Sequence, residues 1–309
     1  MKVSATATLL PEAAAANLWL LTAKIPGMTP AGQQWVRAAQ PTTFRDLAAA
    51  FCVLPLVSLA NAGEVSPTER LEILQEVYRK QIAGISEKHV RMADGREIEI
   101  DDGRRKSHAD KLANADIEDM LSQVYPVIGC LPPGAALPVD FDPGRIRNES
   151  FFKSIYGASK EEVTAKIAWV DWYGQKLAVN RTLEVDKKLE AVKNDLTPSL
   201  SSIGTYLKPS AGTFNWRTIA GTSQMSTHSY AIAIDIASDK ADYWRWSKPR
   251  PGMTAEVRKK IPEQIVAAFE RHGFIWGGNW YHFDTMHFEY RPELIAIGML
   301  AKKRGCSAL

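Results

Sequence analysis

The chain has 309 residues, of which 45% are apolar and 24% charged, and it contains 20 Gly and 17 Pro. This composition is ordinary for a globular protein, and it excludes a disordered chain, a collagen-like fibre and a coiled coil. The length allows one large domain or two smaller ones. The formal net charge is +3 and no basic stripe runs along the chain, so we expect no nucleic-acid partner.

The first 62 residues show, in order, the features of a secretory signal. Arg37 and Arg45 precede an uncharged run over residues 47–59, and Ala60-Asn61-Ala62 supplies small residues at both ends of a cleavage motif. The run is too short to span a bilayer, which takes about 20 apolar residues. We therefore predict cleavage after Ala62 and an exported protein, periplasmic or associated with the cell wall. A buried helix and an uncleaved anchor are the alternatives.

Removal of residues 1–62 would leave 34 basic and 33 acidic residues, so the mature chain is nearly neutral. Met28 is a natural start for such a signal, which leaves the start of translation open between Met1 and Met28. The mature chain keeps two cysteines, Cys130 and Cys306. In an exported protein they can form a disulfide that ties the C-terminal tail to the body, or they can remain two thiols.

Residues 63–115 predict an N-terminal helical extension. Ser66 can cap a helix with Pro67 in its first turn, and Glu69 occupies the capping-box position. Apolar residues then recur at helical spacing. Residues 92–110 are charged and contain glycine, which predicts a hairpin or loop, and a second helix is expected from about residue 115 to 125.

Residues 116–309 predict a single catalytic domain of the α+β class, with a small antiparallel sheet packed on helices. Residues 131–145 contain several Pro and Gly, which predicts a connecting loop there. From about residue 150 the signals of helices and strands alternate. The expected elements are a short helix capped by Ser159, a hairpin over 169–180, helices over 185–196 and 262–272, a β-rich run over 230–237 and a short strand over 286–290.

Two motifs in the C-terminal part carry the chemistry. His228 and Asp235 lie in the first motif, and Asp284 and His287 lie in the second. Two His and one Asp can give zinc three protein ligands and leave a fourth position for water, which distinguishes a catalytic from a structural zinc site. Asp284, three residues before His287, is placed to accept a proton from that water.

The spacing within each motif requires an irregular backbone. Side chains on one face of a strand differ by an even number of residues. His228 and Asp235 differ by seven, so a bend or bulge lies between them or His228 precedes the strand. Asp284 and His287 differ by three, and Gly277-Gly278-Asn279 favours a loop with Asp284 near its end.

The residues around these motifs resemble the zinc D,D-peptidases of the VanX/VanY type. The fold group of this family also contains the lysostaphin-type enzymes and the hedgehog signalling domain. The similarity covers about residues 216–291 strongly and extends weakly to about residue 120, with Asp142 to Arg147 in the weaker part. The matching pattern is Ser226-x-His228-x6-Asp235 followed by Gly277-Gly278-x-Trp280-x3-Asp284-x2-His287-Phe288-Glu289.

By this resemblance His228, Asp235 and His287 are similar to the zinc ligands of the family. Asp284 matches its general base, and Asp rather than Glu there is similar to the branch of D-alanyl-D-alanine carboxypeptidases and L-alanyl-D-glutamate endopeptidases. Ala231 departs from the pattern, which has Gly at this position. Glycine adopts the required bend easily, and we expect Ala to occupy a right-handed bulge instead. The resemblance therefore implies Zn²⁺ as the cofactor, with an intact ligand set.

Four further residues are candidates for the site. Ser226 matches a residue that can hydrogen-bond the substrate. Trp280 belongs to a group of aromatics that can line a substrate groove, with a place in the core as the alternative. Arg217 is the candidate cation for the developing oxyanion, with a surface or structural arginine as the alternative. Glu289 shares strand parity with His287 and can accept a hydrogen bond from its ring, with a structural ion pair as the alternative.

The remaining histidines receive no catalytic role. His282 is expected to be a loop histidine with its hydrogen bonds satisfied, although it can line the cleft. His108 is expected at the surface or at a helix end, like His89 and His272.

The resemblance and the predicted export together imply peptidoglycan stem peptides as substrates. The enzyme would remove the terminal D-Ala or cut the L-Ala–D-Glu bond. A non-catalytic zinc-containing module of the same fold, binding peptidoglycan or a partner, is the main alternative. Asp284 favours the enzyme, because a binding module needs no proton acceptor beside the metal. A zinc hydrolase acting on a non-wall dipeptide is a third possibility.

Overall fold

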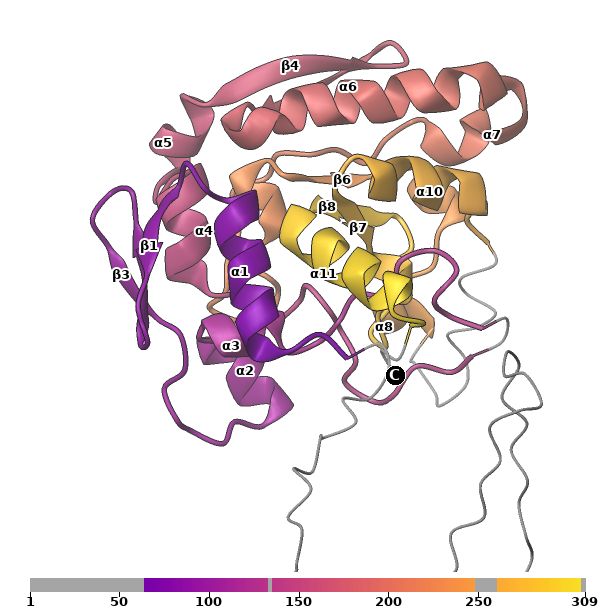
Figure 1. The fold of residues 1–309 in the computed structure, drawn as a ribbon. Coiled ribbons are helices and arrows are strands. Elements are labelled where there is room, and N and C mark those ends of the chain that lie inside the picture. Colours follow the sequence, from indigo (N-terminus) through magenta and orange to yellow (C-terminus); the bar gives the residue numbers. More distant parts are fainter. Residues whose placement is uncertain (1–63, 133–134, 248–259, 307–309) are drawn as a thin grey trace, which may run out of the picture. The chain divides into compact units, whose positions relative to one another are not determined.

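The structure is a computed structural model that describes residues 64–132, 135–247 and 260–306. The predicted signal, its cleavage site and Met28 lie outside the described residues. Helices and small antiparallel sheets alternate along the chain, which confirms the α+β class (Figure 1). Within the described ranges no helix has the length and apolar character needed to cross a membrane.

The N-terminal part contains a sheet as well as helices. As expected, Ser66 and Glu69 form a capping box at the start of α1. The expected helix over 115–125 is shorter, because Ala115 is extended and Asp116 caps a new helix. The three strands pair antiparallel in chain order. The elements are α1 (Pro67–Val77), β1 (Ile82–Ile85), β2 (His89–Met92), β3 (Glu97–Glu99), α2 (His108–Asn114) and α3 (Ile117–Leu121).

A helix and a hairpin form one layer of the C-terminal part, at the top of Figure 1. The hairpin turns at Tyr173 and Gly174, whose φ angles of 51° and 92° suit a two-residue turn between twisted strands. Trp172 is buried, and its indole N–H donates to the carbonyl of Leu207 at 2.9 Å. The elements of this region are α4 (Glu149–Tyr156), α5 (Lys160–Thr164), β4 (Ile167–Trp172), β5 (Gln175–Asn180), α6 (Val185–Leu196) and α7 (Leu200–Leu207).

A three-stranded antiparallel sheet lies at the centre and brings the two motifs together. Its order is β6-β8-β7, and Asp235 on β6 stands directly opposite His287 on β8. Phe269 and Phe288 stack in the core with ring centroids 3.9 Å apart. Both α10 and α11 pack against β7. The elements are β6 (Ala233–Asp235), α8 (Trp244–Ser247), α10 (Glu263–Arg271), β7 (Phe274–Trp276), β8 (His287–Tyr290) and α11 (Pro292–Lys303).

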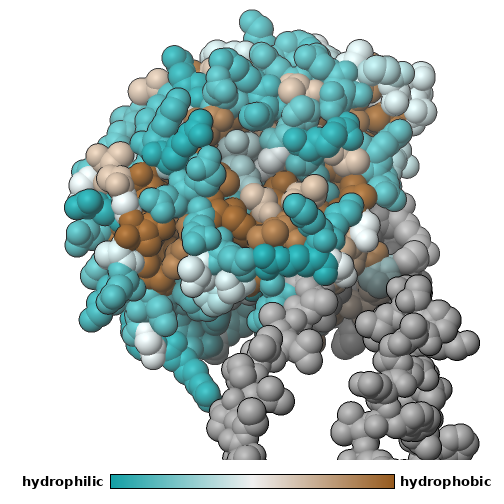
Figure 2. Space-filling model, viewed as in Figure 1, coloured by the Kyte–Doolittle hydropathy of each residue, from teal (hydrophilic) through white to brown (hydrophobic). Residues whose placement is uncertain are grey.

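Helix α1 lies beside α11, so the N-terminal part shares the hydrophobic core of the C-terminal part (Figure 1). The buried hydroxyl of Tyr78 donates to Glu293 at 2.6 Å across this contact. Seen from the same side, hydrophobic side chains are exposed among hydrophilic ones (Figure 2). Met299 on α11 is one exposed apolar residue, with 53% of its surface accessible.

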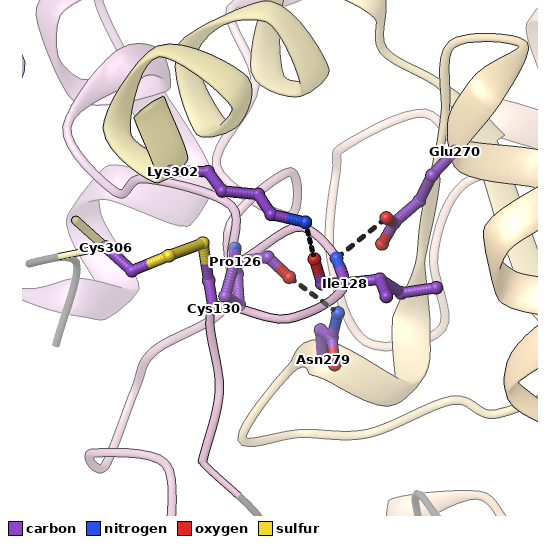
Figure 3. Close-up of a disulfide and its surroundings, with 7 residues drawn as sticks. All are labelled: Pro126, Ile128, Cys130, Glu270, Asn279, Lys302 and Cys306. Carbon is purple, nitrogen blue, oxygen red and sulfur yellow. Dashed lines mark hydrogen bonds between the residues drawn. A yellow bond between two sulfur atoms is a disulfide. The ribbon is translucent and has the colours of Figure 1, made fainter. Parts of the chain in front are cut away.

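Cys130 and Cys306 form a disulfide (Figure 3). The bond joins the segment after α3 to the end of α11. Lys302 supports the same contact, because its ammonium group donates to the carbonyl of Ile128 at 2.6 Å. Of the two alternatives that the sequence left open, the structure therefore has the disulfide.

Candidate metal centre

Three side chains converge on one point beside the central sheet. The Nε2 atom of His228 lies 3.2 Å from the Nδ1 atom of His287 and 3.2 Å from one carboxylate oxygen of Asp235. The other oxygen of Asp235 lies 3.0 Å from the Nδ1 atom of His287. Two ligand atoms that bind one tetrahedral zinc ion at its usual distances are about 3.3 Å apart. The spacing and chemistry of these donors therefore fit a metal ion.

The backbone of the first motif explains how residues seven apart face the same point. His228 lies in a 3-10 helical turn over Thr227–Tyr230, and Asp235 is the last residue of β6. Between them Ala231 is left-handed, with φ 54° and ψ 37°. The expectation of a right-handed bulge at Ala231 is wrong: the left-handed residue ends the turn and redirects the chain into β6. Such a conformation costs a residue other than Gly about 1–2 kcal/mol.

Two glycines allow the second motif to form its loop. A Cβ atom on Gly277 would lie 2.5 Å from the carbonyl oxygen of Asp284, and one on Gly278 would lie 2.2 Å from the ring of Trp276. Any side chain would therefore displace the segment that carries Asp284. The loop ends where β8 begins at His287, so Asp284 precedes the strand as the spacing predicts.

Each of the two histidine rings, His228 and His287, makes a hydrogen bond on the side away from the candidate metal position. This bond determines which ring nitrogen faces that position. The Nδ1 atom of His228 lies 2.7 Å from the carbonyl oxygen of Thr213. A carbonyl only accepts, so Nδ1 carries the proton and the lone pair of Nε2 is free. In the same way the Nε2 atom of His287 donates to Glu289 at 3.1 Å, and its Nδ1 atom faces the point. Such partners orient metal-binding histidines and raise their affinity.

Glu289 fulfils both roles that the sequence left open: it accepts a hydrogen bond from the ring of His287, and it belongs to a structural ion pair. Besides His287, its carboxylate accepts from Thr227 at 3.0 Å and from Arg291 at 3.2 Å, and Arg147 lies 3.7 Å away. The side chain is completely buried. Burial raises the pKa of Glu289, but His287 and the two arginines outweigh it and hold the pKa well below its usual range. The carboxylate is thus both an ion-pair partner and the acceptor for the ring of His287.

Several charged groups lie close together at the candidate metal position and shift one another's pKa values. Burial raises the pKa of Asp235, but His228 and His287 outweigh it and keep the group ionised. Burial lowers the pKa of His287, but its hydrogen bonds to Asp235 and Glu289 raise it to about 10. Burial raises the pKa of Asp284 to about 6, against the opposing charge of His287. Asp284 also has one buried oxygen with no hydrogen-bond partner among the described residues.

All eight candidate site residues selected from the sequence line one pocket. They are Arg217, Ser226, His228, Asp235, Trp280, Asp284, His287 and Glu289. Arg217 is exposed, at the rim. Ser226 caps the turn that holds His228, accepting a hydrogen bond from its N–H at 3.4 Å. Trp280 is almost fully buried and donates to the carbonyl of Pro143 at 2.6 Å.

The sequence reasoning gave no role to Arg145, which also lines this pocket. Its guanidinium lies 4.4 Å from the centre of the Trp280 ring and donates to the carbonyl of His282 at 2.7 Å. Its charge lowers the pKa of Asp284, although less than His287 does. Arg145 lies in the segment from Asp142 to Arg147, for which the sequence analysis gave a weak resemblance to the family. That resemblance is the signal that could have identified Arg145.

Comparison with known proteins supports the resemblance. Residues 220–290 match a family model described as D-alanyl-D-alanine carboxypeptidase. The matched segment contains the three converging side chains and Asp284. No curated protein and no solved structure matches the chain. The family match and the His and Asp cluster support a peptidase, and residues 220–290 are similar to the M15 family, that of the VanX/VanY-type D,D-peptidases.

Proposed function

We propose that this protein is a zinc metallopeptidase that hydrolyses peptidoglycan stem peptides, as a D-alanyl-D-alanine carboxypeptidase or an L-alanyl-D-glutamate endopeptidase. The observation that carries the proposal is the place of Asp284. Its carboxylate has one buried oxygen without a hydrogen-bond partner among the described residues, and it lines the pocket on which two histidines and Asp235 converge. A proton acceptor beside such a donor set is what metal-assisted hydrolysis requires.

His228, Asp235 and His287 would hold the ion. When bound, zinc supplies Lewis acidity, which polarises the scissile carbonyl and lowers the pKa of a water molecule from 15.7 towards about 7. Asp284 accepts the proton of the attacking water at its free carboxylate oxygen and passes it to the leaving amine. Glu289 keeps the ring of His287 in place while this happens.

A positive charge is needed where negative charge develops on the carbonyl oxygen. Arg217 reaches the pocket from the exposed rim, and its only hydrogen bond from the guanidinium among the described residues is a long one to Thr218, at 3.4 Å. It can therefore turn towards a substrate at little cost. Arg145 is held by His282 and Trp280, so we assign it to the wall of the pocket.

The substrate class rests on the family and on the predicted signal, which would bring the protein to the periplasm or cell wall. A non-catalytic module that binds peptidoglycan or a partner is the second candidate. The free oxygen of Asp284 argues against it, because a buried polar atom without a partner costs about 1–3 kcal/mol. A binding module gains nothing in return for this cost.

The full chain, loaded with Zn²⁺, should be incubated with defined muropeptides and the products read by mass spectrometry. Loss of a terminal D-Ala would identify a carboxypeptidase, and a cut between L-Ala and D-Glu would identify an endopeptidase. Asp284→Asn, which keeps the shape of the side chain, is the matched inactive control. If no stem peptide is cut by a protein with its metal bound, the hydrolase proposal fails and the binding module takes its place.

A further inference from the structure

A second cluster of histidine and aspartate lies beside the candidate metal centre and shares no residue with it. His108 is the first residue of α2, Asp142 lies in the loop before α4, and His282 lies two residues before Asp284. One carboxylate oxygen of Asp142 lies 2.6 Å from Nδ1 of His282 and 3.4 Å from Nε2 of His108. The three possible ligand atoms lie within 4.8 Å of one another.

We propose that His108, Asp142 and His282 form a second binding site for a divalent transition-metal ion such as Zn²⁺. Two imidazole nitrogens and one carboxylate oxygen are a donor set that zinc and its neighbours prefer, whereas calcium and magnesium prefer oxygen alone. The proposal concerns metal binding only and does not depend on the peptidase activity.

The charge of the carboxylate suits a cation. Asp142 is completely buried, which raises its pKa, but His108, His282 and Arg145 outweigh burial and hold the pKa well below its usual range. The group is therefore an anion inside the protein. The cation of Arg145 also weakens binding of a further cation, so we expect this site to bind metal less tightly than the first.

One ring nitrogen in the cluster makes an ion-pair contact but no hydrogen bond. The Nε2 atom of His108 is buried and makes no hydrogen bond to any described residue, although the carboxylate of Asp142 is 3.4 Å away. A buried nitrogen in this state costs about 1–3 kcal/mol. A metal ion between the three side chains would satisfy its lone pair.

The ligands are already oriented. The other oxygen of Asp142 accepts from the backbone N–H of His282 at 2.8 Å. The rings of His108 and His282 are nearly parallel, with 19° between their planes and 6.0 Å between their centroids. Trp244 packs edge-on against His282 at 4.8 Å. The histidine side chains are 17% and 23% exposed, so an ion can enter from solvent.

A bound ion would tie α2 of the N-terminal part to the loop that carries Asp284. The test is the number of ions bound by the metal-stripped full chain after equilibrium dialysis against Zn²⁺, measured by elemental mass spectrometry. We expect about two ions per chain for the wild type and about one for His108→Ala. Replacing both His228 and His287 by Ala should also leave about one ion, and adding His108→Ala to that protein should leave none.

His272→Ala is the matched control, because His272 also pairs with an aspartate, Asp195, at 3.0 Å but has no second histidine beside it. It should bind as many ions as the wild type. Circular dichroism must show that each variant is folded, and His282→Gln provides a second variant of the cluster. One ion in the wild type, or two ions in folded His108→Ala, would overturn the proposal and leave a hydrogen-bonded cluster only.

Discussion

Glu289 accepts a hydrogen bond from Nε2 of His287 at 3.1 Å, and the two residues lie on the same face of β8. This contact turns Nδ1 of His287 towards the candidate metal position. The second oxygen of Glu289 accepts a hydrogen bond from Arg291, which also donates to Glu293. Glu293 in turn accepts from Tyr78, the residue that follows the end of α1. The candidate metal centre is thus connected through buried ion pairs to the N-terminal helix.

Replacing Glu289 with Gln should weaken metal binding. The variant keeps an oxygen acceptor but loses the charge that raises the basicity of His287, and it leaves buried Arg147 without its anion and Arg291 with Glu293 alone. Loss of such an outer partner lowers metal affinity by about 10- to 100-fold. Competition with a chelator measures the change, with Glu263→Gln on the exposed start of α10 as the control. An affinity equal to that of the wild type would refute the positioning role.

Asp284→Asn should abolish hydrolysis without removing the metal. Amide nitrogen and oxygen cannot accept the proton of the attacking water, so we expect kcat to fall by about 10²- to 10⁴-fold. The metal content should stay at the wild-type value, because Asp284 is outside the ligand set. Asp239→Asn, on an exposed turn, is the control with the same chemical change. Full activity of Asp284→Asn would mean that another group accepts the proton.

Arg217→Gln should lower kcat by about 10²-fold or more, since one oxyanion donor contributes roughly that much. Because this side chain lies at the rim, protein stability should not change. Arg245→Gln is a suitable comparison, because Arg245 is also an exposed arginine that bonds a nearby backbone carbonyl. Should kcat stay constant in Arg217→Gln, the oxyanion role would pass to Arg145, which lines the same pocket.

The left-handed backbone at Ala231 should tolerate Gly but not Val. Glycine adopts this conformation freely, and the substitution removes only one buried methyl group. The free energy of unfolding of Ala231→Gly should therefore lie within about 1 kcal/mol of the wild-type value. A β-branched residue is a strong outlier at positive φ, and we expect Ala231→Val to lose more than about 2 kcal/mol and to bind metal weakly. Denaturant unfolding and metal content test both. Equal stability of the Val and Gly variants would contradict the left-handed assignment.

Glu270 should make stability depend on pH. Burial raises the pKa of its carboxyl to about 7, against the hydrogen bonds from the N–H of Ile128 (Figure 3) and from the hydroxyl of Tyr125, which lower it. The folded pKa exceeds the unfolded value of 4.5, so the folded state binds the proton more tightly. The contribution of this proton to stability is complete below pH 4.5 and is lost as the pH rises through 7.

The magnitude follows from linkage: the free energy of unfolding of the wild type should fall, relative to Glu270→Gln, by roughly 3 kcal/mol between about pH 4 and pH 8. Glu270→Gln cannot titrate, so the difference between the two proteins isolates this group. Urea unfolding at a series of pH values measures it. Parallel pH profiles of the two proteins would show that Glu270 does not titrate in this range.

Local signals predicted much of the fold. The capping box at Ser66, the hairpin around Gly174 and the helix from Val185 to Leu196 depend on residues within a few positions of one another, and all three are confirmed. The sheet within the N-terminal part was not predicted as a sheet. Its pairing depends on contacts between strands, which short-range patterns do not specify.

The sequence identified the residues of the candidate metal centre through the motifs around them, which resemble those of a known peptidase family. The types and spacing of two histidines and two aspartates were not decisive by themselves. Only the tertiary structure decided that Ala231 is left-handed, that Glu289 holds His287, and that His108 meets Asp142 and His282. The reason is physical: the first kind of information lies in chemistry and short spacing. The second depends on tertiary packing, which sets the backbone at Ala231, aligns Glu289 with His287 and brings His108, Asp142 and His282 together from distant parts of the chain.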